Sequence, residues 1–233
     1  MDLDIERDAE RPETRTVQQW VLDRLRRAIL TGRFPPGRAV TIRGLAEQLG
    51  VSAMPVREAL RTLISENALV LLDNRRVRVP EMTLDRFEEL LSARIALEGE
   101  AAERAIFSID GNALAELEQM DAAIGRAIEA GDVEGWIEAN FAFHARIYRA
   151  RPSSVLMPLI ESLWLQIGPF MRYALEGLEE HYGVDRHSEA LDAIRKRNRV
   201  ALRRAIESDI RDGIGHLGLA LLRRMEGDGL VSG

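Results

Sequence analysis

Hydrophobic residues recur at helical spacing along most of the chain, and strand-like patterns are confined to one short region. An amphipathic helix is predicted over 16–30, followed by a turn rich in proline and glycine at 33–37. Two further helical patterns meet at Gly50, which suits a helix end because glycine adopts positive φ without a Cβ clash. The stretch 41–66 therefore predicts a helix-turn-helix, a motif whose second helix presents its first side chains to the major groove of DNA.

The second helix of this pair is expected to begin after Ser52, whose hydroxyl can cap it, and Pro55 is tolerated in the first turn. One face of the helix carries apolar residues at helical spacing: Val56, Ala59, Leu60, Leu63 and Ile64. The opposite face carries Arg57 and Arg61, so the polar face is basic.

The segments 69–72 and 77–79 have strand patterns, and a basic turn joins them. They predict a wing, although an ordinary solvated hairpin would have the same pattern. From residue 84 onward the pattern is helical, with helices predicted at about 84–107, 112–130, 133–149, 154–176, 186–198 and 200–226. Pro169 is expected to kink the fourth of these helices.

The predicted fold is mainly α: a winged helix-turn-helix domain followed by an all-α antiparallel helical bundle. The expected limits are a disordered tail at 1–14, the first domain at 15–80 and the bundle at 81–233.

Charge is distributed unevenly along the 233 residues, whose formal net charge is −6. Residues 15–80 hold 12 arginines and 5 acidic residues, whereas 81–233 hold 18 basic and 27 acidic residues. A basic module on an acidic body fits nucleic-acid contact by one end, although such unevenness also arises by chance. The chain has no cysteine, which excludes disulfides and thiolate metal sites. No apolar run reaches membrane-spanning length and the acidic N-terminus is no signal peptide, so a cytoplasmic location is expected.

The helix-turn-helix resembles the GntR family of bacterial transcription regulators. The matching runs are Leu45-Ala46…Leu49-Gly50-Val51-Ser52 and Pro55-Val56-Arg57-Glu58-Ala59-Leu60-Arg61. The resemblance implies DNA contacts from Arg43 and Arg57, with Ser52, Met54 and the wing residues Asn74 and Arg75 as further candidates. Ala53 stands where many members have a DNA-contacting arginine, and a methyl group cannot make a bidentate contact to guanine.

The rest of the chain resembles the FCD ligand-binding domain of the FadR branch of that family. The matching positions are Arg94-Ile95-Ala96-Leu97-Glu98 with Ala101-Ala102, Asn140-Phe141-Ala142-Phe143-His144, His187 with Leu191, Ala193, Ile194 and Ala201, and His216. The short step from Val79 to the first bundle helix favours the six-helix VanR-like subgroup.

This second resemblance implies a divalent transition metal, zinc or nickel, held by Asn140, His144, His187 and His216. Asn140 and His144 are four residues apart and therefore share a helix face, and three imidazoles with one oxygen suit such an ion. The alternatives are that the histidines are hydrogen-bonded core residues and that Asn140 is an interior amide.

In such domains the effector is usually a small organic acid or sugar acid. Arg94 and Arg172 are candidates to hold its carboxylate by a bidentate fork. Arg94 could instead form a structural salt bridge with Glu98, four residues away.

The function expected from these features is a ligand-responsive transcription regulator, a repressor acting as a homodimer on a pseudo-palindromic operator. Two alternatives are a metal-dependent hydrolase that uses the histidines and a metal sensor without an organic effector. Against the hydrolase, no carboxylate is obviously placed as a general base, and the His-Glu-x-x-His motif is absent. The chain is therefore not expected to be an enzyme.

Overall fold

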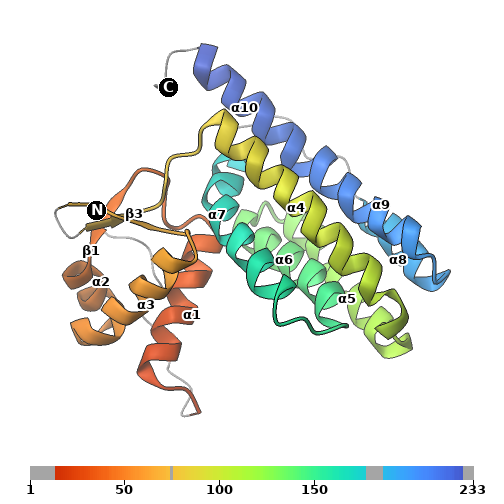
Figure 1. Ribbon diagram of the computed structural model, residues 1–233, viewed down its shortest axis with the longest axis horizontal. Helices are drawn as coiled ribbons and strands as arrows, with labels where there is room; N and C mark the ends of the chain where they lie inside the picture. The colour runs from red at the N-terminus through yellow and green to blue at the C-terminus, as the bar shows by residue number, and fades with distance from the viewer. Residues whose placement is uncertain (1–13, 74–75, 177–185, 228–233) are drawn as a thin grey trace. The chain divides into compact units, whose positions relative to one another are not determined.

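The computed structural model describes residues 14–73, 76–176 and 186–227. The chain divides into two compact units that are each mainly helical (Figure 1). The first unit comprises the described part of Met1–Met82 together with Leu165–Phe170. The second comprises Thr83–Trp164 and the described part of Met171–Gly233.

The first unit is a three-helix group with a small sheet. Its elements are α1 (Val17–Leu30), β1 (Ala39–Thr41), α2 (Ile42–Leu49), α3 (Ala53–Ser65), β2 (Val70–Leu71) and β3 (Arg76–Arg78). Both α1 and α2 pack against α3, which forms the centre of the unit. The predicted turn between α2 and α3 is confirmed, because Gly50 adopts φ +64° at the end of α2.

The sheet has the order β1-β3-β2, with antiparallel pairing throughout. Val77 of β3 lies opposite Val40 of β1 on one side and Leu71 of β2 on the other. The sequence pattern predicted β2 and β3 but missed β1, whose three residues are too few for a periodic signal. The predicted wing residues Asn74 and Arg75 lie outside the described residues.

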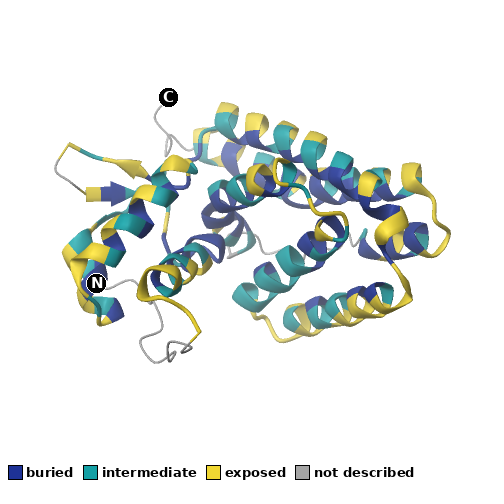
Figure 2. Ribbon diagram, turned by 60° about the horizontal axis from the view of Figure 1, so that its bottom comes forward, coloured by how far each residue is buried: buried dark blue, intermediate teal, exposed yellow. Residues whose placement is uncertain are grey.

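The second unit is a helical bundle. Its helices are α4 (Leu84–Ala105), α5 (Gly111–Glu129), α6 (Val133–Arg149), α7 (Leu156–Glu176), α8 (His187–Arg195), α9 (Arg199–Ile210) and α10 (His216–Gly227). α4 runs along α9, and α5 packs against both α6 and α8 (Figure 1). In Figure 2 the helices turn their buried residues toward their neighbours and their exposed residues outward, as their amphipathic patterns predict.

The end of the bundle differs from the predicted single helix over 200–226. A π-helical turn at Arg211–Gly215 separates α9 from α10, and Gly213 within it has non-helical dihedral angles of φ −78° and ψ −114°. Gly215 fits there because a Cβ atom would lie 3.0 Å from the carbonyl oxygen of Ile210. By contrast, α7 continues through Pro169 as one helix.

Among the described residues, no helix combines the length and the hydrophobicity that crossing a membrane requires.

Candidate functional site

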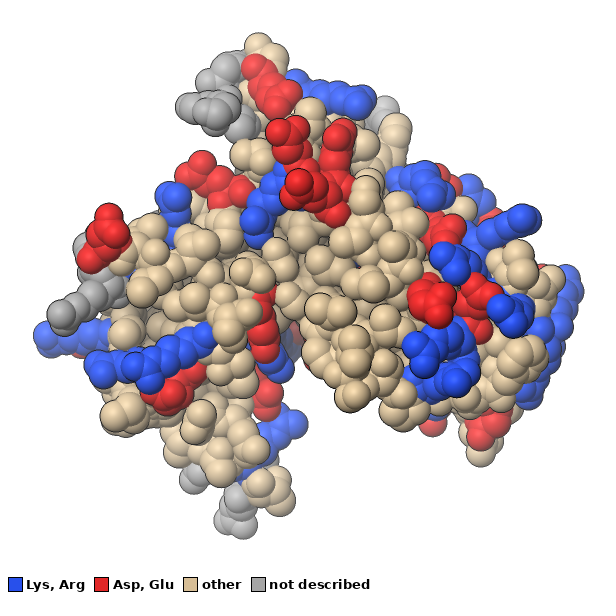
Figure 3. Space-filling model, viewed as in Figure 1, with Lys and Arg blue, Asp and Glu red and all other residues tan. Residues whose placement is uncertain are grey.

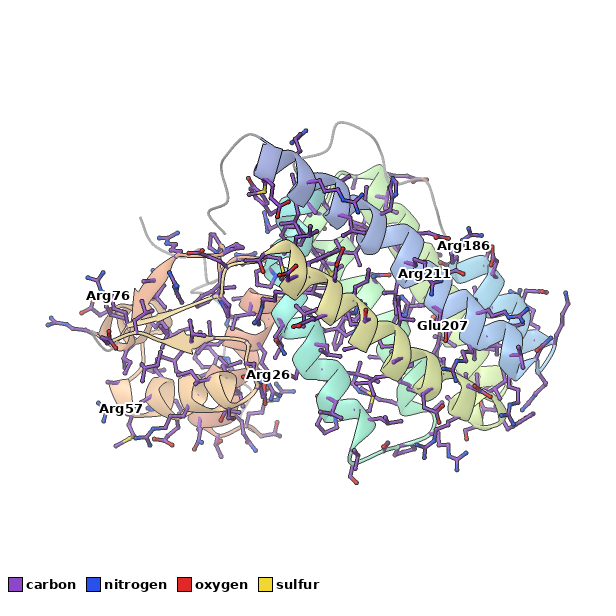
Figure 4. The ribbon with its side chains drawn as sticks, turned by 45° about the horizontal axis from the view of Figure 1, so that its top comes forward. Arg26, Arg57, Arg76, Arg186, Glu207 and Arg211 are labelled. Atoms are coloured by element: carbon purple, nitrogen blue, oxygen red, sulfur yellow. The ribbon has the colours of Figure 1, made fainter. Side chains whose placement is uncertain are left out.

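The first turn of α3 presents a group of exposed side chains. Ser52, Ala53 and Met54 are all exposed, and 61% of the Met54 surface is accessible. Arg57 follows one turn later and is also exposed; both Arg57 and Arg76 point away from the core of the first unit (Figure 4). These are the positions from which a helix-turn-helix contacts bases and phosphates.

Two details of this face qualify the sequence prediction. Ser52 occupies the N-cap position of α3 with extended backbone angles, but its hydroxyl makes no capping hydrogen bond. Arg43 on α2 is highly exposed, and its Nε donates to Glu47 Oε1 at 2.9 Å. A surface pair of this kind contributes only about 0–1 kcal/mol, so Arg43 can exchange Glu47 for a phosphate at little cost. Figure 3 shows basic side chains projecting from the exposed surface of the first unit.

The second unit contains a buried group of potential metal ligands on three helices. His144 on α6, His187 on α8 and Asp209 on α9 are at most 7% exposed, and their ligand atoms all lie within 4.8 Å of one another. Asp209 Oδ2 lies 3.1 Å from His144 Nε2, and Asp209 Oδ1 lies 3.8 Å from His187 Nε2. Donors bound to one zinc ion lie roughly 3–3.5 Å apart when each bond is about 2.0–2.2 Å long, so the 3.1 Å separation suits a shared cation and the 3.8 Å separation is somewhat longer.

The tautomer of His144 follows from its hydrogen bonds. Its Nδ1 lies 3.0 Å from the Tyr148 hydroxyl, which donates its own hydrogen to Glu98 Oε2 at 2.9 Å. The hydroxyl oxygen can therefore only accept from His144, so Nδ1 carries a hydrogen, and Nε2 carries a lone pair whenever the ring is neutral. Nε2 is buried and has no hydrogen bond of normal geometry within the described structure, although a carboxylate oxygen of Asp209 lies beside it.

His187 is oriented in the same way by an acidic residue. Its Nδ1 lies 3.2 Å from Asp121 Oδ1 on α5, and a carboxylate oxygen can only accept. When its ring is neutral, His187 Nε2 therefore also presents a lone pair toward Asp209. Metal-binding histidines characteristically donate their second ring nitrogen to a carboxylate or another oxygen, which fixes the tautomer and the ring orientation.

The third potential ligand, Asp209, is charged at neutral pH. Burial raises the pKa of its carboxyl group, but the hydrogen bond and positive charge that His144 supplies when protonated, with the charges of protonated His187 and of Arg94, outweigh burial and lower the pKa. The carboxylate is therefore available to a cation. Arg186, the residue before α8 that is labelled in Figure 4, donates from Nη2 to Asp212 Oδ2 at 2.9 Å in the π-helical turn that follows α9.

A cavity in the same unit adjoins this group and contains an arginine with unused hydrogen-bonding capacity. Arg94 is 2% exposed, its Nε donates to Glu98 Oε1 at 2.6 Å, and its guanidinium carbon lies 4.1 Å from the centre of the Trp164 ring. Its Nη1 is buried without a hydrogen-bond partner among the described residues. The cavity is lined by Arg94, Trp136, Asn140, Met171, Leu175, Asp209, Ile210, Ile214 and Leu217. A buried cationic donor without an acceptor favours binding of an anionic ligand in this cavity.

The structure brings together some of the predicted residues and not others. His144 and His187 share the buried group, and Asn140 lines the adjoining cavity one turn before His144. His216 is exposed at the start of α10, so the structure does not bring it into the group, and Asp209 supplies the third ligand atom instead. Arg172 lies 3.8 Å from Glu134 Oε2 and does not line the cavity.

Sequence reasoning missed Asp209, although a signal for it exists. The buried residues of α9 recur at helical spacing as Leu202, Ala205, Ile206, Asp209 and Ile210. An acidic residue on an otherwise apolar helix face needs a buried partner, so this position could have been singled out. Asp121 has no comparable signal, because its partner His187 lies on another helix, whereas Tyr148 lies four residues after His144 on α6 and could have been singled out.

Comparisons with known proteins identify both units. Residues 17–79 match the family described as bacterial regulatory proteins of the gntR family, and residues 89–212 match the FCD domain. The HTH-type transcriptional regulator McbR of Escherichia coli (strain K12) is 31% identical over 198 residues, covering 83% of this chain and 89% of the relative. The solved structure of E. coli McbR/YncC superposes with a TM-score of 0.83 at 29% identity, covering 89% of this chain and all of that one.

A further relative is the "Probable D-xylose utilization operon transcriptional repressor" of Paenarthrobacter nicotinovorans. It is 30% identical over 182 residues, which cover 77% of this chain and 79% of the relative. These relatives are transcription regulators and not enzymes. The chain belongs to the GntR family of bacterial regulatory proteins, in the group whose members carry an FCD domain.

Proposed function

We propose that this GntR-type regulator is a repressor that binds a pseudo-palindromic operator as a homodimer and releases it in response to a small organic or sugar acid. A symmetric dimer requires two similar half-sites about one helical turn apart. The relative named for D-xylose utilization supports control of a catabolic operon in the cytoplasm. The short connection between the units favours the VanR-like subgroup of FCD regulators.

The FCD unit of the proposed regulator holds a divalent transition metal through His144, His187 and Asp209. The fit rests on two imidazole nitrogens and an ionised carboxylate whose atoms lie within 4.8 Å of one another. Asn140, on the adjoining cavity wall, offers an amide oxygen. Zinc and nickel are the proposed ions because both accept imidazole nitrogen and carboxylate oxygen. When bound, the ion would supply positive charge that attracts an effector carboxylate.

The effector is proposed to bind in the cavity that Arg94 and Asp209 line, which has a volume of about 20 Å³ and would have to widen to admit an acid. The observation that carries this assignment is the buried Nη1 of Arg94, which lacks an acceptor while its Nε is held by Glu98. Glu98 and Trp164 fix the plane of the guanidinium, so its remaining nitrogens are already oriented for a carboxylate. The same donor favours an organic effector over a regulator that senses only the metal.

Binding at this site affects DNA affinity only if the effector prefers one arrangement of the dimer over the other. The π-helical turn follows directly after Asp209 and Ile210, and Ile214 within it lines the cavity, so we propose that this preference arises there.

The experiment that tests this proposal is a thermal-shift screen with small carboxylic and sugar acids, run on protein dialysed against a chelator and then reloaded with zinc or nickel. An acid that binds the folded protein at about 100 times its Kd stabilises it by about 2.7 kcal/mol, which gives a clear shift. The shift should require the metal and should disappear in Arg94→Lys, which keeps the charge opposite Glu98 but lacks the fork. Shifts of equal size in Arg94→Lys, or in the metal-free protein, would contradict the proposal.

A further inference from the structure

The recognition helix has an unusual surface where it would meet DNA. Ala53 and Met54 form its first two positions, and both are exposed; the accessible fraction of Met54, 61%, is among the highest for a large apolar residue in the described structure. An exposed methionine gains nothing from burial in the free protein. At the start of α3 its thioether side chain is therefore free to pack against an apolar group on a partner surface.

Major-groove edges of DNA offer one apolar group that fits this description. Thymine carries a 5-methyl group there, whereas the guanine edge presents two acceptors that require a cationic fork. A methyl and a thioether side chain can bury a thymine methyl but cannot satisfy the guanine acceptors. The side-chain chemistry at positions 53 and 54 thus selects for thymine and against guanine.

The helix geometry places this apolar pair beside the basic residue of the same face. Met54 and Arg57 are three residues apart on α3, so their side chains are neighbours on one surface of the helix. Arg57 is exposed and forms no ion pair with any described residue, which leaves its guanidinium available to a base or phosphate. The three residues together form a short strip that is apolar at one end and cationic at the other.

We infer that this regulator recognises thymine in each operator half-site through the thymine 5-methyl group, which packs against Met54 and Ala53. The inference rests on the DNA-binding function that the GntR match establishes, and it adds which base the exposed apolar pair reads. Arg57 contacts a base or a phosphate at the adjoining position of the same half-site. The half-site is accordingly richer in thymine at the α3 contact than one read by an arginine at position 53.

The test separates this inference from the function on which it rests. Duplexes that bind the purified full-length protein are first selected from a random-sequence library. Failure to enrich any sequence over random DNA would overturn the DNA-binding function itself. Each thymine in the enriched half-site is then replaced by deoxyuridine, which removes only the 5-methyl group and keeps the base pairing.

At one or two positions, deoxyuridine should weaken binding of the wild-type protein roughly fourfold, the ratio that burial of one methyl group gives. Met54→Ala should bring the thymine-to-uracil ratio at its position close to one, and Ala53→Gly should do the same at the position that Ala53 contacts. Leu71→Ala is the matched control, because Leu71 is 64% exposed in the same unit but lies on β2 rather than on α3. Leu71→Ala should therefore show the same ratio of affinities for thymine-containing and uracil-containing duplexes as the wild type.

Two results would overturn the inference while leaving DNA binding intact. One is wild-type affinity that is unchanged by deoxyuridine at every half-site thymine. The other is a thymine preference that survives undiminished in both Met54→Ala and Ala53→Gly. Because both side chains are exposed, neither substitution is expected to unfold the protein.

Discussion

His144 Nε2 and Asp209 Oδ2 lie 3.1 Å apart in the buried centre of the second unit, without a hydrogen bond of normal geometry between them. The hydrogen on the other ring nitrogen leaves a lone pair facing a carboxylate oxygen, and two acceptors repel one another at this distance. With a neutral imidazole such a pair is unfavourable, and either a proton on the ring or a metal ion between the two atoms would stabilise it. This relationship is the physical basis for the proposed metal site, and it makes the surrounding hydrogen bonds testable.

The hydroxyl of Tyr148 should control metal affinity without touching the ion. In Tyr148→Phe, His144 loses the acceptor that fixes its tautomer and orientation, so metal affinity should fall about 10- to 100-fold. Competition with a chromophoric chelator measures this change directly. Tyr173→Phe is the control, because Tyr173 is a half-exposed tyrosine of α7. The metal affinity of this variant should equal that of the wild type. Equal affinities in both variants would remove Tyr148 from the site.

The carboxylate of Asp209 should be essential for the metal. Asp209→Asn keeps the size of the side chain but removes its negative charge, so elemental analysis of the purified variant should show little bound metal. Asp192→Asn, on the surface where Asp192 pairs with Lys196, should retain the wild-type content. Full metal occupancy in Asp209→Asn would contradict the proposal, because the ion would then be bound without the Asp209 carboxylate.

The buried pair of Arg94 and Glu98 should matter far more for stability than a surface pair. Glu98→Ala leaves the Arg94 guanidinium without its buried counter-charge, and the free energy of unfolding should fall by about 3–5 kcal/mol. Glu118→Ala breaks the exposed pair with Arg195 and should cost about 0–1 kcal/mol. Urea denaturation of the two variants gives the comparison, and similar losses would contradict the assigned roles.

Arg57 should contribute to DNA affinity and not to folding. Arg57→Ala should weaken binding to a selected duplex by about 1–3 kcal/mol while leaving the thermal unfolding midpoint unchanged, because the side chain is exposed. Arg195→Ala removes the same charge from the second unit and serves as the control in the gel-shift titration. Wild-type affinity in the Arg57 variant would show that α3 is not the recognition helix.

The helices of both units follow closely from the sequence because local signals determine their ends. Gly50 ends α2 at positive φ, and Thr16, Thr83 and Asp110 cap α1, α4 and α5 with their side chains. These interactions involve residues only a few positions apart, so they are visible in the order of amino acids. The π-helical turn after α9 is not visible in this way, because a helical hydrophobic pattern continues across it.

The candidate metal site could be predicted only in part, because some of its contacts join residues that are far apart in the sequence. The pair of Asn140 and His144 is a local motif, whereas the third ligand depends on which residue of a distant helix faces them. His216 and Asp209 lie within two turns of each other in sequence, and the π-helical turn between them decides that Asp209 is buried and His216 exposed. The tertiary partner Asp121 likewise becomes evident only when the helices are packed, whereas Tyr148 lies four residues from His144 on the same helix.

The most direct measurement is the affinity of the metal-loaded protein for its selected duplex, relative to random DNA, titrated with the acid that stabilises the protein most. The account predicts strong preference for the selected duplex, and a change of roughly 5- to 150-fold in that affinity on adding the acid, lost after metal removal or in Arg94→Lys. Affinity for the selected duplex that equals affinity for random DNA, or that stays constant across the acid titration, would contradict it.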